Sequence, residues 1–203
     1  VRSFSAQAAI VSFIWNGRNE TNTQVSDGTY TWTITATDPA TQAQATPVSG
    51  TVKVDTVIDT SQITEPLANA NLSGTIAIKG LANDSNFAYD PQPGQYGYWQ
   101  LYYGLGTNPT SWTALAGSSA PAVLDAFNNP PTLYSWNTSQ RTNGPYVLRL
   151  QVYDTAGNIS DTRVPVTLYN IAINNAQATN LVFSPNQDGS EDTTEIKADL
   201  TAT

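Results

Sequence analysis

The chain of 203 residues contains no cysteine, no histidine and no methionine. Without cysteine there is no thiolate nucleophile, no thiolate metal ligand and no disulfide framework. Without histidine there is neither an imidazole metal ligand nor the usual general base near neutral pH. These absences exclude much familiar enzyme chemistry, and they argue against a small disulfide-stabilised domain of the eukaryotic secreted kind.

Charged residues are also scarce, at 12% of the chain, and 16 acidic residues outnumber 8 basic ones, which gives a net charge of -8. This charge repels phosphate backbones and anionic lipids, so we expect no nucleic acid partner and no binding to membrane surfaces. No apolar run is long enough to span a bilayer, and we expect no membrane insertion. No signal peptide is present, so an exported protein would correspond to a mature or excised piece of its precursor.

One pattern occurs twice in the chain, about 116 positions apart. In 27–38 and again in 143–154, a turn dipeptide is followed by a Tyr and an alternating strand, and an Asp closes the segment. A Trp-Asn pair precedes each copy, at Trp15 and at Trp136. Repetition at this period indicates stacked modules. Such an architecture is typical of proteins that span a distance or bind a partner rather than of enzymes.

The period favours modules of roughly 80 to 120 residues, the usual size of a small β-sandwich. Short alternating segments bounded by Gly, Pro, Asn and Asp predict an all-β fold of antiparallel strands. We expect residues 1–56 to form a module that lacks its first strands, 57–170 to form a second module, and 171–203 to hold a linker and the first strands of a further module.

Some finer features are also predicted from the local pattern. The stretch 1–14 alternates loosely and predicts one or two strands, and 57–66 is expected to be a short linker that limits bending. The stretch 120–127 is the one place where a short helix is plausible, before Pro130 and Pro131 break it.

The repeated segments resemble a known family. The turn at Trp15-Asn16-Gly17, the segment 27–38 and the closing segment 50–55 resemble bacterial immunoglobulin-like modules of the flagellar hook-cap type. That family begins with a phrase like Phe-Ser-Pro-Asn-x-Asp-Gly-x-x-Asp, which stands here as 183–192. The segment 146–158 is similar to that of many extracellular immunoglobulin-like repeats. The resemblance implies tandem immunoglobulin-like β-sandwiches with Greek-key topology, which serve as spacers in surface proteins, adhesins, secreted enzymes and appendages.

The tail and the first module look complementary. The segment 194–200 can be laid beside 74–80 at the head of the second module, and 178–203 together with 1–56 would amount to one small sandwich. Either the chain is a piece of a longer array, or the tail supplies strands to the first module, in the same chain or in the next subunit. The residues that would be donated are Phe183, Ile196, Ala198 and Leu200.

One polar cluster has the character of a cation loop. Asn186, Asp188 and Asp192 place oxygen ligands at positions i, i+2 and i+6 around Gly189, a spacing that can wrap a hard cation such as calcium. Asn and Asp beside Gly also form ordinary turns, and the terminal Glu of an EF-hand loop is missing. The cluster is thus a candidate calcium site whose alternative is a capped turn.

Other acidic residues favour structural roles. Asp38 and Asp154 each end the repeated strand and begin a turn, so we expect them to shape the chain. Asp84 and Asp90 lie in a loop rich in Asn, Pro and Gly, which could form a second cation loop but is more simply a solvated one.

The aromatic strand 98–103 offers a candidate interface. Tyr98 and Tyr102 share one face of the strand, and Trp99 and Leu101 share the other. If Trp99 and Leu101 enter the core, the two tyrosines remain as surface rings that could stack on a sugar or on another module.

These observations predict a non-enzymatic structural module of a bacterial extracellular or cell-surface protein. Its role would be that of a stalk, filament or adhesin scaffold, whose partners are neighbouring repeats or further copies of itself. Head-to-tail assembly by strand donation is a sharper form of this hypothesis. The alternative is a carbohydrate-binding or accessory module of a secreted polysaccharide-active enzyme, in which Tyr98 and Tyr102 would contact glycans.

Overall fold

The computed structural model describes residues 2–6, 11–87, 97–190 and 192–202. These residues form twelve β-strands and no helix, as the alternating sequence predicts for an all-β chain. The chain divides into two compact units, Val1–Val57 and Ile58–Thr203. The second unit contains a β-sandwich of two sheets, and each unit also has a sheet of only two strands.

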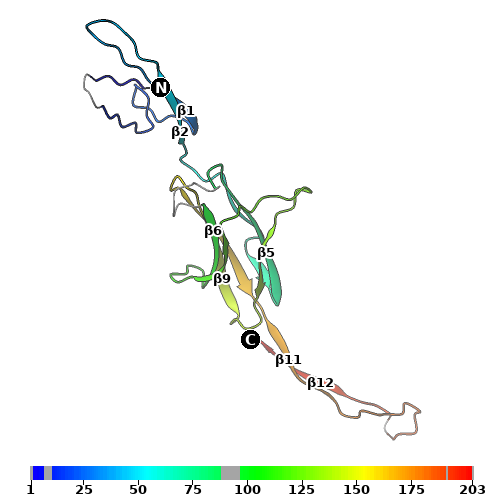
Figure 1. Cartoon of the computed structure of the whole chain (residues 1–203). Coiled ribbons are helices and arrows are strands. Elements are labelled where there is room, and N and C mark those ends of the chain that lie inside the picture. Colours follow the sequence, from blue (N-terminus) through cyan, green and yellow to red (C-terminus); the bar gives the residue numbers. More distant parts are fainter. Residues whose placement is uncertain (1, 7–10, 88–96, 191, 203) are drawn as a thin grey trace. The chain divides into compact units, whose positions relative to one another are not determined.

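The sandwich consists of a five-stranded and a three-stranded sheet. In Figure 1, β6 and β9 of the larger sheet lie side by side and face β5 of the smaller one. The smaller sheet has the order β3 (Thr60–Glu65), β5 (Thr75–Asn83) and β8 (Thr132–Asn137). The larger sheet has the order β4 (Ala70–Leu72), β10 (Ile159–Leu168), β9 (Gly144–Tyr153), β6 (Tyr98–Leu105) and β7 (Thr113–Ser118).

Alternate residues of these strands build one core between the sheets. Because successive side chains of a strand point to opposite faces, each central strand gives one apolar row to the interior. Trp136 of β8 stacks on Tyr103 of β6 with ring centroids 5.2 Å apart. The fully enclosed side chains of the core include Ile78, Leu101, Leu148, Leu150, Val152 and Leu168.

The first and last strands of the sandwich run in the same direction. Ser61 at the start of β3 is hydrogen-bonded to Thr162 near the start of β10, with the two hydroxyl oxygens 3.0 Å apart. Further along, β4 pairs with β10 in parallel, and Leu72 lies opposite Leu168 at the end of β10. The chain therefore enters the sandwich beside the start of β10 and leaves it at the other end of the same strand.

The first unit contains one regular sheet, formed by β1 (Gly28–Ile34) and β2 (Val48–Val54). The indole of Trp32 lies over Gly50 on the neighbouring strand, where an added Cβ would overlap the ring. No second sheet of the described residues covers this apolar face: Trp15 contacts Tyr30 at one end, with ring centroids 5.2 Å apart, and the side chain of Trp32 is 43% exposed.

The pair β1–β2 reproduces β9–β10 residue by residue. Gly28 pairs with Val54 at one end, as Gly144 pairs with Leu168, and the two ladders continue in the same register. Trp32 thus corresponds to Leu148, which is fully buried in the sandwich. Two segments with the same register differ in whether a second sheet covers them.

A tyrosine near the start of each repeated strand makes the same hydrogen bond. The hydroxyl of Tyr30 donates to the carbonyl oxygen of Ser26 at 2.7 Å, and that of Tyr146 donates to Thr142 at 3.1 Å. Each tyrosine lies two residues after a glycine with positive φ, which is 150° at Gly28 and 132° at Gly144. Residues with a side chain rarely adopt this conformation. The repeat in the sequence is therefore also a repeat in conformation.

Replacing Tyr146 by Phe is expected to lower the free energy of unfolding of the sandwich by about 1 kcal/mol, since the part-buried hydrogen bonds of its hydroxyl to the carbonyl and the hydroxyl of Thr142 are lost while the ring is kept. Urea unfolding followed by tryptophan fluorescence measures it. The matched control is Tyr30→Phe in the first unit, which should leave the sandwich unchanged. Equal effects of the two variants on the sandwich transition would contradict the conclusion that the Tyr146 hydroxyl stabilises the sandwich and the Tyr30 hydroxyl does not.

The tail forms a hairpin of β11 (Ile171–Ala178) and β12 (Ile196–Ala202). Its register matches that of β3–β5 when 194–200 is laid beside 74–80. Ile173 pairs with Leu200 as Ile63 pairs with Gly80, and both hairpins have a register shift shortly after this pair. Ile173 is 68% exposed whereas Ile63 is 7% exposed, so this hairpin too lacks a covering sheet.

Several local predictions were wrong. The expected linker 57–66 contains β3, because Ile63 has a place in the core. No helix forms in 120–127, where Ala122 instead makes a β-bridge to Ala82. The described part of 1–14 contains no strand.

The tail also differs from its prediction in one respect. Phe183 lies in the connection between β11 and β12, and the strand paired with β12 is β11. Ile196, Ala198 and Leu200 do lie on β12, as the alternating sequence predicts.

Candidate functional site

The predicted aromatic face lies on the outside of the larger sheet. Trp99 and Leu101 are in the core, and Tyr98 and Tyr102 point to the opposite face, as the strand pattern predicts. Tyr98 stacks on Tyr153 of β9, with ring centroids 4.3 Å apart and an interplanar angle of 14°. The hydroxyl of Tyr102 is hydrogen-bonded to the side-chain oxygen of Gln100. The stacked pair therefore has one ring face of each tyrosine occupied by the other.

A charged cluster lies on the same sheet. The carboxylate of Asp161 on β10 accepts hydrogen bonds from Arg149 of β9, the shortest at 2.6 Å, and from Arg163 at 3.1 Å. Both guanidinium groups lie over the ring of Trp112, at 5.0 and 5.3 Å from its centroid. Such cation–π contacts hold the loop before β7 against the sheet. This cluster could not be predicted from the sequence, because Arg149 and Asp161 are brought together by the pairing of β9 with β10.

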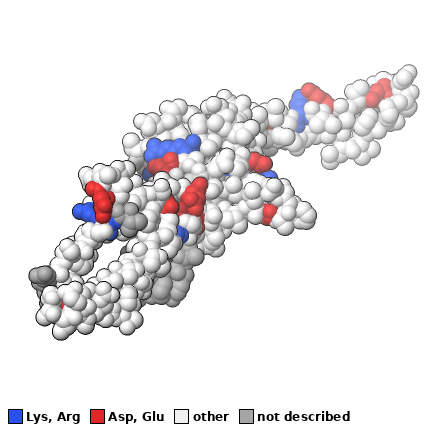
Figure 2. All heavy atoms as spheres, turned by 90° about the horizontal axis from the view of Figure 1, so that it is seen from above, with Lys and Arg blue, Asp and Glu red and all other residues white. Residues whose placement is uncertain are grey.

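Charges of one sign do not gather on the face shown in Figure 2, where most surface carries no charged side chain and basic groups lie beside acidic ones. The four ion pairs of the described residues agree with this mixed distribution of charge, since in each of them a basic side chain lies beside an acidic one. An electrostatic binding surface for a polyanion is therefore not a feature of this face.

Hydrogen bonds from Arg149 lower the pKa of Asp161 to about 2, with a smaller contribution from Arg163. A carboxyl group whose pKa is lower in the folded than in the unfolded state stabilises the fold above its unfolded pKa of about 3.9. We expect this contribution to disappear as the pH falls from about 4 through about 2. Urea unfolding over this range, compared between the wild type and Asp161→Asn, measures it.

The variant Asp161→Asn should lose stability near neutral pH and show a flatter pH dependence below pH about 4, because residue 161 no longer titrates. The carboxylate is partly exposed, so solvent reduces the size of the effect. Parallel curves for the two proteins across this range would show that the Arg149 contact does not stabilise the fold.

The candidate calcium loop is closed by its own hydrogen bonds. The oxygens of Asp188 accept from the Ser190 amide at 2.9 Å and from the Asn186 side chain at 2.8 Å. Those of Asp192 accept from the amides of Gln187 at 2.8 Å and Gly189 at 2.7 Å. The bond from Ser190 is the main cause of a lowered pKa of Asp188. The loop has the geometry of a capped turn, and calcium binding at Asn186, Asp188 and Asp192 stays a prediction.

A second acidic group lies at one end of the sandwich, just after β5 and β9. The carboxylates of Asp84 and Asp154 are buried, with oxygens within 4.8 Å of each other. Asp84 accepts a hydrogen bond from the Asn86 amide at 2.6 Å, and Asp154 accepts from the amide of Asn158 at 2.8 Å. Two buried carboxylates offer ligands to a hard cation, and each also fixes a turn, the role predicted for Asp154. Asp90 lies outside the described residues.

Asp38, at the equivalent place in the first unit, also fixes a turn. Its carboxylate accepts hydrogen bonds from the amides of Ala40 at 2.8 Å and Thr41 at 3.3 Å. The bond from Ala40 is the main cause of a lowered pKa of Asp38. The structural role predicted for this residue agrees with these contacts.

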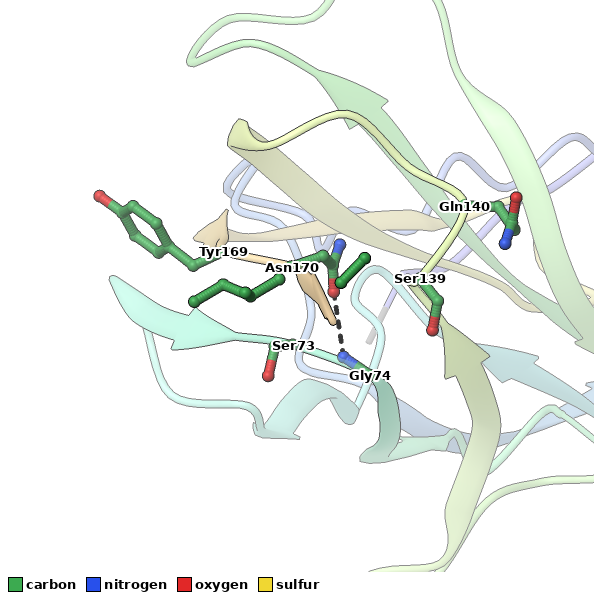
Figure 3. Close-up of a pocket in the computed structure, with 8 residues that line it drawn as sticks. Ser73, Gly74, Ser139, Gln140, Tyr169 and Asn170 are labelled. Atoms are coloured by element: carbon green, nitrogen blue, oxygen red, sulfur yellow. Dashed lines mark hydrogen bonds between the residues drawn. The ribbon is translucent and has the colours of Figure 1, made fainter. Parts of the chain in front are cut away.

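Asn170 joins the end of the sandwich to the tail. Its side-chain oxygen accepts hydrogen bonds from the amide of Gly74 at 3.1 Å and from the hydroxyl of Thr138, and its amide donates to the Thr138 carbonyl at 2.8 Å. Figure 3 shows the bond to Gly74 at the centre of a pocket of about 430 Å³. The pocket lies where the sandwich meets the tail, and its lining includes Tyr169 and Ile171 on either side of Asn170.

Sequence reasoning did not single out Asn170, although the repeat holds a signal for it. The backbone of Asn170 exchanges hydrogen bonds with the side chain of Asn143. At the same place in the first unit, Thr56 donates two hydrogen bonds to Asp27. In both copies the residue before the first strand of the pair is thus hydrogen-bonded to the second residue after the other strand.

Neither family models nor curated protein sequences match this chain. Among solved structures it is similar to CopC from Methylosinus trichosporium OB3b, with 13% identity and a TM-score of 0.25. The similarity covers 52% of this chain and 87% of that protein. The described residues contain no helix of the length and apolar character needed to cross a bilayer.

Proposed function

We propose that the chain is a non-enzymatic, load-bearing part of a bacterial extracellular or cell-surface protein, built from tandem immunoglobulin-like sandwiches. The observation that carries this proposal is the direction of the first and last strands of the sandwich. The chain enters beside the start of β10 and leaves at its end, and β4 lies parallel to β10 between these points. A pull on the two ends is therefore directed along the strands.

This geometry determines how the sandwich resists force. When two paired strands are pulled along their axes in opposite directions, all the hydrogen bonds between them bear load together. When a hairpin is peeled from one end, its bonds break one after another. Here the pairs Ala70–Val166, Asn71–Thr167 and Leu72–Leu168 belong to the first kind. The arrangement suits a stalk or filament segment that must transmit tension.

The immunoglobulin-like assignment is supported by the two tyrosines. A tyrosine whose hydroxyl bonds to the backbone a few residues upstream is typical of immunoglobulin-like sandwiches, and Tyr30 and Tyr146 both make this bond. Two sheets with an apolar core between them are the second supporting feature. The extracellular location is supported by the absence of cysteine together with the resemblance to surface modules.

Single-molecule force spectroscopy tests the load-bearing role. We expect the full chain, pulled from its ends, to show one high-force event for the sandwich. Asn71→Pro in β4 should lower that force, because proline disturbs the short parallel ladder. Ala114→Pro on the other edge of the same sheet is the control, since β7 pairs only with β6 and lies outside the path of the load. Equal losses of force in the two variants would contradict the proposal.

The second candidate function is glycan binding on the outer face, favoured by the outward position of Tyr98 and Tyr102. Stacking between Tyr98 and Tyr153 leaves their outer ring faces for a sugar. A glycan array with the wild type, Tyr98→Ala and Tyr102→Ala distinguishes the two functions, because a scaffold shows no binding that depends on these rings.

A further inference from the structure

Two sheets of the chain have an apolar face that no second sheet of the described residues covers. The head face is formed by β1–β2, and the tail face by β11–β12. A two-stranded sheet is marginally stable in water, and uncovered apolar faces commonly mark interaction sites. The head face consists of Tyr30, Trp32, Ile34, Val48 and Val52, and the tail face consists of Ile171, Ile173, Ile196, Ala198 and Leu200.

The sandwich shows how two such faces fit together. Its hairpin β3–β5 packs over β9–β10, and these two elements share the registers of β11–β12 and β1–β2 respectively. In the complete sandwich Ile63 and Leu148 are buried, whereas their equivalents Ile173 and Trp32 are exposed. The head face and the tail face therefore correspond to the two halves of one sandwich.

At one contact between the two halves, both partners differ between the complete sandwich and the two uncovered faces. In the sandwich, Ser61 of β3 and Thr162 of β10 are joined by hydrogen bonds of 2.8 and 3.0 Å. Through the shared registers, Ser61 corresponds to Ile171 of the tail face and Thr162 to Val48 of the head face. A polar pair in the complete sandwich is thus replaced by an apolar pair, so the two faces remain complementary at this point.

We propose that the tail face of one copy of this chain packs on the head face of a second copy, as β3–β5 packs on β9–β10. The contact would place Ile171 against Val48 and would bury Trp32 and Ile173. This assembly goes beyond the load-bearing role, which concerns a single sandwich.

The points at which the two faces are joined to the sandwich favour a contact between two copies over a contact within one chain. The head face is joined to the sandwich where β3 begins, beside Thr162. The tail face is joined at Asn170, eight residues further along the direction of β10, or about 26 Å away. Asn170 is held by Gly74, Thr138 and Asn143, and β11 begins at the next residue. The hairpin has no free segment with which to turn back along the sandwich. A contact between different faces of two copies propagates as a head-to-tail chain.

Sedimentation velocity over a wide range of protein concentration tests this contact. We expect the wild type to form species that grow with concentration. Ile173→Asp blocks the tail face and Val48→Asp blocks the head face, so each variant alone should remain a monomer. An equimolar mixture of the two should form dimers and nothing larger, because one intact tail face and one intact head face remain for each pair.

Control variants separate this contact from general stickiness. Thr31→Asp and Thr201→Asp place the same charge on the opposite faces of β1 and β12 and should associate like the wild type. Dimers in the mixture would show that the head face of Ile173→Asp and the tail face of Val48→Asp are folded, which the urea midpoint of the sandwich does not report. A wild type that stays monomeric, blocked variants that still associate, or a mixture that stays monomeric would each overturn the inference. The force measured on a single chain is independent of all these outcomes.

Discussion

Replacing Leu148 by Ala is expected to lower the free energy of unfolding of the sandwich by about 3 kcal/mol. Leu148 lies at the centre of β9 and is fully buried. Its truncation removes apolar contacts with both sheets and leaves a cavity that the rigid strands can only partly fill. Urea unfolding followed by far-UV circular dichroism measures this loss, since the sandwich contains most of the regular strands.

The repeat supplies a matched control for this variant. Trp32 occupies the place of Leu148 in the first unit, and its side chain is 43% exposed. Trp32→Ala removes a larger side chain, yet it should leave the sandwich transition unchanged at protein concentrations where the chain is a monomer. A loss of sandwich stability in Trp32→Ala as large as that in Leu148→Ala would mean that the two units unfold as one.

Replacing Asn170 by Ala is expected to lower the stability of the sandwich by about 2 kcal/mol, since it leaves one part-buried amide without a partner and removes two hydrogen bonds to Thr138. The group left without a partner is the amide of Gly74, whereas the hydroxyl of Thr138 keeps its bond to the Gly74 carbonyl and the carbonyl of Thr138 keeps that from the Arg141 amide. The cost of an unpaired buried group is about 1–3 kcal/mol, larger than the net gain from a typical hydrogen bond. Urea unfolding again provides the measurement.

The same variant should also release the tail. With the Asn170 side chain gone, the hairpin that begins at Ile171 loses its connection to Gly74, and limited proteolysis is expected to cut between the sandwich and β11 more rapidly. Thr56→Ala is the control, because Thr56 has the equivalent place in the first unit and its hydrogen bonds to Asp27 are exposed. If the two variants destabilised the sandwich equally, Asn170 would not be its closing contact.

The strands that could be predicted from the sequence are those with a regular apolar row. In β6, Trp99 and Leu101 enter the core and Tyr98 and Tyr102 face outward, as alternation requires. The turn at Gly144 was predicted because glycine tolerates the positive φ found there. These features depend on a few adjacent residues, and a single sequence contains that information.

The strands that were missed have weak local patterns. In β3 only Ile63 is buried, and its neighbours are polar, so the pattern predicted a linker. β11 contains Asn174 and Asn175 in its middle, where the register shifts. Both are strands because a partner strand offers them a ladder of hydrogen bonds, a condition that lies outside their own sequence.

The candidate sites show the same division. The outward position of Tyr98 and Tyr102 followed from one strand, but the stacking of Tyr98 on Tyr153 required β6 and β9 to be neighbours. The approach of Asp84 to Asp154, and that of Arg149 to Asp161, likewise join residues of different strands. The spacing of these residues along the chain does not predict such contacts.

By itself the sequence determined an all-β chain with a repeated module and no cysteine or histidine chemistry, because composition and alternation are local properties. Only the tertiary structure decided which copy of the repeat is covered. The strands β9–β10 and β1–β2 share a register, yet the first pair lies beneath β3–β5 and the second has an exposed apolar face. The physical reason is that burial depends on which sheet packs against a strand, and that partner is chosen by contacts between distant parts of the chain.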